Sequence, residues 1–102
     1  MNRSFRVRIL GCDYDLRPGE SDELHSRWGF MSIQKREIVY ATHMDESTIK
    51  DTVFHELIHV ADLATSTESN ELTEQQVMRI GAVLFGILRD HDSLVEWLLG
   101  EE

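Results

Sequence analysis

The clearest helical pattern in the sequence is residues 47–64, STIKDTVFHELIHVADLA. Its apolar residues recur three or four positions apart, a spacing that places them on one face of an α-helix. Asp45 and Glu46 come just before it and supply a capping carboxylate and a negative charge at the end where the helix dipole favours one. The sequence therefore predicts a helix over residues 47–64 with one face in the core.

This predicted helix contains the motif HExxH, with His55, Glu56 and His59. At about 100° per residue the two histidines lie about 40° apart and one turn apart, so both imidazoles can bind one zinc ion. Glu56 lies about 100° around the helix from His55, where its carboxylate can contact a zinc-bound water rather than the metal. The motif predicts His55 and His59 as zinc ligands and Glu56 as a general base.

The alternative for the two histidines is a hydrogen-bonded pair in the core, without a metal. Two histidines and a glutamate near the buried side of an apolar helix are costly to bury unless they have a partner. This cost favours zinc over the metal-free alternative.

A second helix is expected to supply the third ligand. Thr73 and Gln76 form the capping box that starts it, and its apolar residues repeat at helical spacing from Val77 onward. Counting back three positions from Val77 places Glu74 on the same inward stripe, so Glu74 is the predicted ligand. The alternative for Glu74 is an ordinary first-turn glutamate favoured by the helix dipole, with Glu71 as the next candidate ligand.

Four further residues are weaker candidates for roles at the site. Asp62 shares the histidine face but lies too far along the helix for the same ion, so it is predicted to orient His59 or a basic neighbour, or else to be solvated. Tyr40 ends a strand that could bind extended peptide at a sheet edge; its hydroxyl could stabilise an oxyanion, or its ring could simply pack. His43 and His91 are minor candidate ligands.

The N-terminal half reads as strands. Residues 5–9 alternate apolar and charged side chains, and residues 28–33 and 38–41 are apolar runs joined by a polar turn. The segment 16–26 is expected to be a loop or a short helix. A last short helix before Gly100 completes an α+β fold, in which a small antiparallel sheet precedes the helices.

The composition describes a small acidic domain. The chain has 102 residues, with 10 Lys or Arg and 19 Asp or Glu, and a formal net charge of −9. We expect one domain over residues 1–102, no nucleic-acid binding, no membrane contact and a cytoplasmic location. Cys12 stands alone, so an intramolecular disulfide is excluded; a small buried residue is expected there, with capping of the metal as an alternative.

Longer stretches of the sequence resemble a known family. The run HELIHVAD, then LTEQQVMRIGAVLFGILRD, after a segment RVRILGCDYD, resembles small phage and prophage-type zinc metallopeptidases related to the ImmA/IrrE and minimal gluzincin peptidases. The resemblance implies a zincin-like packing of the sheet on the HExxH helix. It also implies His55, His59 and Glu74 as ligands of Zn²⁺, Glu56 as the catalytic base, and a location in the host cytoplasm if the gene belongs to a phage.

Two functions are compatible with these residues. The first is a zinc-dependent endopeptidase acting on a protein or peptide substrate. The second is a catalytically silent module in which zinc holds two helices together for protein binding. The sequence favours the enzyme, because a purely structural zinc site normally has four protein ligands and would leave Glu56 without a role. Substrate and oligomeric state stay open.

Overall fold

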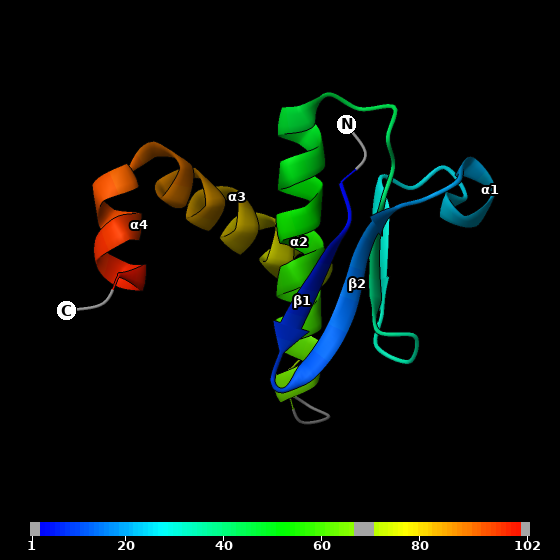
Figure 1. Cartoon of the computed structure of the whole chain (residues 1–102), viewed down its shortest axis with the longest axis horizontal. Coiled ribbons are helices and arrows are strands. Elements are labelled where there is room, and N and C mark those ends of the chain that lie inside the picture. Colours follow the sequence, from blue (N-terminus) through cyan, green and yellow to red (C-terminus); the bar gives the residue numbers. More distant parts are fainter. Residues whose placement is uncertain (1–2, 67–70, 101–102) are drawn as a thin grey trace.

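The computed structural model describes residues 3–66 and 71–100. The elements follow one another as β1 (Phe5–Ile9), β2 (Cys12–Pro18), α1 (Ser21–Leu24), β3 (Gly29–Ser32), β4 (Glu37–Tyr40), α2 (Glu46–Thr65), α3 (Glu74–Asp90) and α4 (Asp92–Leu99). The predicted α+β class is confirmed. Figure 1 shows α2 as the centre of the molecule, with the sheet on one side and α3 leading away from the other, carrying α4 at its far end.

The sheet is mixed, so the antiparallel sheet expected from the sequence is wrong. The strand order is β1-β2-β4-β3, with antiparallel outer pairs and a parallel central pair, β2 and β4. The error lies in the segment 16–26, because residues 16–18 belong to β2 and only residues 21–24 are helical. Since β3 runs back along the sheet before β4 returns, β4 lies beside β2 in the same direction.

The core lies between the sheet and α2. Its larger cluster of buried side chains joins the strands β2 and β4 to the helix α2 through Tyr14, Leu16, Ile38, Tyr40 and Val60. A smaller cluster on the opposite face of β4 joins Leu24 of α1 to Val39 and Ala41. The long helix α2 is thus fixed against the sheet along its length.

Tyr40 does not have the position that an oxyanion donor needs. Its strand, β4, is an interior strand paired on both sides, rather than the predicted edge. The side chain is only 2% exposed, and its hydroxyl donates a hydrogen bond to the Arg3 carbonyl oxygen at 2.6 Å. Tyr40 therefore packs in the core, where it belongs to the buried cluster that contains Val60 of α2.

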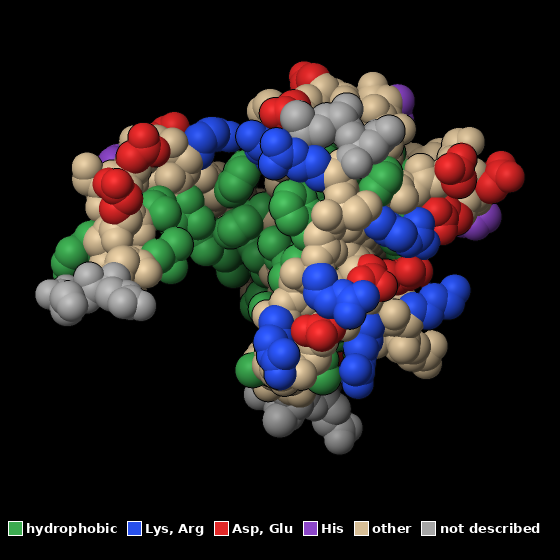
Figure 2. All heavy atoms as spheres, viewed as in Figure 1, with side chains coloured by type: hydrophobic (Ala, Val, Ile, Leu, Met, Phe, Trp, Pro, Cys, Tyr) green, Lys and Arg blue, Asp and Glu red, His purple; other side chains and the backbone are tan. Residues whose placement is uncertain are grey.

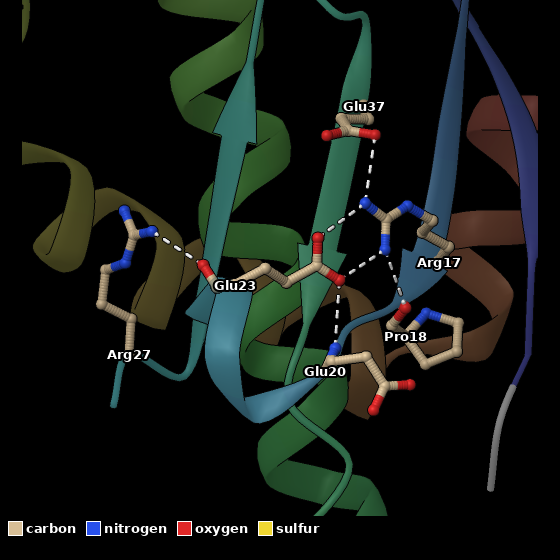
Figure 3. Close-up of polar contacts among 6 residues, drawn as sticks. All are labelled: Arg17, Pro18, Glu20, Glu23, Arg27 and Glu37. Carbon is tan, nitrogen blue, oxygen red and sulfur yellow. Dashed lines mark hydrogen bonds and ion pairs between the residues drawn. The ribbon is translucent and has the colours of Figure 1, made fainter. Parts of the chain in front are cut away.

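A charged cluster fixes α1 over one end of the sheet (Figure 3). The Arg17 guanidinium on β2 donates to both carboxylate oxygens of Glu23, at 2.8 and 3.0 Å, and to Glu37 of β4 at 3.3 Å. Hydrogen bonds from Arg17 and from the Glu20 backbone hold the pKa of Glu23 at about 2, below its usual 4.5. Arg27 donates to the Leu24 carbonyl at the turn that leads into β3.

The helix starts follow the predicted capping. The Asp45 side chain accepts from the Thr48 backbone N–H, and the reciprocal hydrogen bonds between Thr73 and Gln76 are both present. The predicted apolar stripe of α3 is only partly covered, since Val77 and Gly81 are its two buried residues. In the part of the chain that the structure describes, no helix has the length and apolar character needed to cross a membrane.

Candidate metal centre

The site lies where α3 begins against the side of α2. Val77 is fully buried there, and Gly81 allows a close approach, because a β-carbon added at Gly81 would lie 3.2 Å from Ile58 Cδ1. This contact sets the first turn of α3 beside the histidines of α2. Glu74 therefore meets a motif that is 15 or more positions earlier in the chain.

The three predicted ligand residues converge. Glu74 Oε1 lies 2.6 Å from His55 Nε2, Glu74 Oε2 lies 2.9 Å from His59 Nε2, and the two Nε2 atoms are 3.2 Å apart. Two nitrogen ligands of one tetrahedral zinc ion lie about 3.3 Å apart. The imidazole pair thus has the spacing that a shared metal ion requires.

Ring protons alone do not satisfy this arrangement. With Glu74 ionised, each Nε2 atom carries at most one proton, so two protons are available for three short contacts among the three groups. A cation between them makes all three favourable, because each group then presents a lone pair to it. His55, His59 and Glu74 form a group that can hold a metal ion, and two imidazoles with one carboxylate suit a transition metal such as zinc.

The group is open on one side. The two histidine side chains are about one-fifth exposed, whereas the Glu74 side chain is 62% exposed. An ion held by three protein ligands at such a place keeps a position free for water or a substrate atom. This openness is typical of catalytic rather than structural sites.

Glu56 lies beside the group without joining it. It lines the same cleft as His55 and Glu74, and burial raises its pKa above the usual range, while the nearby His59 and His55 act in the opposite direction. A carboxylate in such surroundings is a better proton acceptor near neutral pH than an exposed one.

The cleft beside the metal group has a volume of about 650 Å³. Its walls come from the start of β3, from α2 and from α3, and they are formed by Arg27, Trp28, Gly29, Asp51, Thr52, His55, Glu56, Glu74, Met78, Gly81, Ala82 and Arg89. Trp28, Gly29 and Met78 were missed by the sequence interpretation. Gly29 carried a usable signal, since a glycine within a strand often marks the close approach of another backbone.

Gly29 brings β3 against the HExxH helix. A β-carbon at this position would lie 2.8 Å from Thr52 Cγ2, 3.0 Å from the Val39 carbonyl oxygen and 3.7 Å from Glu56 Cγ. Only a glycine permits this spacing without a shift of strand or helix. The edge strand of the sheet thereby forms one wall of the cleft.

The remaining candidates lie apart from the metal group. The Asp62 carboxylate accepts a hydrogen bond from the Leu72 backbone N–H at 3.0 Å, and no hydrogen bond to His59 is present in the described part of the chain. Asp62 thus ties the end of α2 to the segment just before α3.

Glu71 and His43 are exposed and outside the group. His91 lies at the far end of α3, within 2.8 Å of the Ile87 carbonyl.

Cys12 also lies away from the metal group. It starts β2 opposite Ile9 and packs against the larger core cluster. Its surroundings agree with a small core residue and place no thiol at the histidines.

Comparison of the chain with family models, with curated proteins and with solved structures gave no match. The resemblance to ImmA/IrrE peptidases therefore rests on the sequence motifs alone.

Proposed function

We propose that this protein is a Zn²⁺-dependent metallo-endopeptidase with a zincin-like site. The observation that carries the proposal is the convergence of His55, His59 and Glu74 in an open cleft with Glu56 beside them. His55 and His59 would bind the ion through Nε2, and Glu74 through its carboxylate. The bound ion would supply Lewis acidity, lowering the pKa of a water molecule and polarising the scissile carbonyl.

The chain's own contribution to the reaction is proton transfer and positioning. Glu56 accepts a proton from the attacking water on its carboxylate and delivers it to the amine nitrogen that leaves. The partly buried surroundings of Glu56 favour this transfer near neutral pH, because a carboxylate with a raised pKa is the stronger base. Asp62 and Val77 contribute indirectly by holding the start of α3, and with it Glu74, in place.

The substrate class follows from the strand beside the cleft. β3 is an edge strand, with β4 as its one partner in the described sheet, and Gly29 places it directly against α2. An extended peptide can add to such an edge by main-chain hydrogen bonds, which would lay its backbone across the metal group. A protein or peptide in extended conformation, in the cytoplasm, is the proposed substrate.

The decisive experiment compares zinc content with cleavage. Protein purified without chelator should contain about one zinc per chain, and Glu56→Gln should keep that zinc while losing cleavage of an unfolded protein substrate by about a thousandfold. Glu71→Gln, an exposed change just outside the group, is the matched control and should behave as the unmodified protein. Absence of zinc, or full cleavage by Glu56→Gln, contradicts the proposal.

A catalytically silent, zinc-stabilised binding module is the second candidate. One observation favours it: α3 contributes only Val77 and Gly81 as buried residues, so a metal bridging α2 and α3 would add to a small interface. For such a module, Glu56→Gln leaves the biological activity intact and His59→Ala removes it through loss of the fold. The same two variants therefore separate the two functions.

A further inference from the structure

The outer half of α3 and the whole of α4 form an apolar arm with little to pack against. α4 has no buried residue, and Trp97 and Leu99 are 72% and 80% exposed. The other large apolar side chains exposed on these two helices are Ile80, Val83, Leu84, Ile87, Leu94 and Leu98, besides Met78, which lines the metal cleft. Scattered apolar residues are normal on a surface, but a contiguous set of this size marks an interaction site.

A continuous groove runs between this arm and the body of the molecule. One hollow of about 360 Å³ lies over the sheet and α2, and a second of about 680 Å³ lies between α2 and α4. Both are lined by Glu46, Lys50 and Phe85, so they join. Figure 2 shows the hydrophobic side chains of this hollow facing the viewer, with basic side chains along its upper rim.

The accessible surface has the excess expected of a chain that pairs. The protein exposes 7497 Å², whereas a compact monomer of 11.8 kDa exposes about 5,900 Å². The radius of gyration is 14.3 Å, compared with about 12.8 Å for a compact domain of this length. The excess of about 1,600 Å² is twice the roughly 800 Å² that each partner buries in a standard stable interface.

Charge identifies the occupant. The groove is lined by three basic residues, Arg3, Lys50 and Arg89, and by one carboxylate, Glu46. Lys50 pairs with Glu46, and Arg89 with Asp51 and Asp90, each at 3.7 Å, but these pairs are largely exposed and weak, so the lining still favours an apolar segment that carries negative charge. α4 itself is such a segment, since Asp92 and Glu96 accompany its apolar side chains. The groove and a segment that fits it are thus present on the same chain, which is the condition for a self-complementary interface.

We propose that the protein forms a symmetric dimer in which α4 of each copy lies in the groove between α2 and α4 of the other. The apolar side chains of α4 cover the groove, and its carboxylates face the basic rim. The metal cleft adjoins this groove, since Arg89 lines both, and the partner copy's α4 would lie between α2 and α4 rather than against Glu74 and the histidines. The dimer is independent of the proposed function.

The test measures the mass of the full chain in solution. Sedimentation equilibrium should give twice 11.8 kDa, with a dissociation constant on the order of 10 μM or below. Trp97→Asp should raise this constant at least about tenfold, because a central aromatic anchor is lost. Ser93→Asp, which adds the same charge on the same helix at a polar position, is the matched control and should change the constant less than about threefold.

Three results would overturn the dimer. A mass of 11.8 kDa up to about 500 μM shows a monomer. A Trp97→Asp variant that dimerises as tightly as the unmodified chain shows that α4 is not in the interface. A monomer that co-sediments with phosphatidylcholine vesicles assigns the apolar arm to a lipid surface instead. Circular dichroism and zinc content of each variant, expected to be unchanged, show that the fold is intact.

Discussion

α2 and α4 are both helices with an apolar stripe, yet they have different surroundings. α2 packs on the sheet on one side and on the start of α3 on the other, and its Val60 is fully buried. α4 packs on α3 and exposes Trp97, Leu98 and Leu99. Helical spacing forms an apolar stripe in both helices, but a stripe becomes part of the core only where a neighbouring element packs on it. His55 and His59 belong to α2, and Glu74 belongs to the start of α3 that packs on it.

The largest expected effect on stability comes from replacing one of the predicted metal ligands. If zinc binds as proposed, His59→Ala should abolish that binding and lower the thermal unfolding midpoint of the zinc-loaded protein by about 10 °C or more, because the ion would no longer bridge α2 and α3. Calorimetry with and without a chelator measures this. The chelator should lower the midpoint of the unmodified protein and leave that of His59→Ala unchanged. Equal midpoints for the two proteins in zinc would contradict the bridge.

The two faces of α3 provide a direct test of the contrast. Val77→Ala should cost about 2 kcal/mol of unfolding free energy, since Val77 is fully buried against α2. Val83→Ala, the same change on the same helix at a position 65% exposed, should cost less than about 0.5 kcal/mol. Urea denaturation of both variants measures the difference. Similar costs would mean that α3 is covered equally on both faces.

The contact between β3 and α2 should tolerate no added atom. Gly29→Ala should destabilise the protein by about 1 to 2 kcal/mol, because the new methyl group meets Thr52 and the Val39 carbonyl. If β3 moves outward to relieve the contact, peptide cleavage should fall further than zinc content. Gly86→Ala is the control, since its β-carbon would have one neighbour, at 3.8 Å. A fully stable and active Gly29→Ala variant would contradict the close approach.

The smallest expected effect concerns α1, which is shorter than α4 but anchored by charge. Because the pKa of Glu23 is about 2 when folded and about 4.5 when unfolded, its ion pair with Arg17 stabilises the fold above pH 4.5 and is lost as the pH falls toward 2. Arg17→Met should flatten the pH dependence of stability in this window. Acid titration followed by circular dichroism measures it. A slope equal to that of the unmodified protein would show that Arg17 does not hold Glu23.

Part of the candidate site could be predicted because its geometry is local. The placing of His55 and His59 one turn apart depends only on helical pitch, and the start of α3 depends only on the capping pair Thr73 and Gln76. The position of Glu74 followed from its spacing to Val77 on the inward stripe. Its meeting with the histidines needed one further condition, the close packing of two helices at Gly81.

The long helices, their caps and the residues on one helical face could therefore be predicted from local patterns in the sequence. The tertiary structure alone decided which strands are neighbours, because the parallel pairing of β2 and β4 joins segments whose contacts are distant along the chain and have no local signature. The tertiary structure also brings the Asp62 carboxylate to the Leu72 backbone N–H and buries Tyr40, whereas it leaves the apolar stripe of α4 exposed. Periodicity marks a face, but coverage of that face requires a second element, and its location is a property of the whole fold.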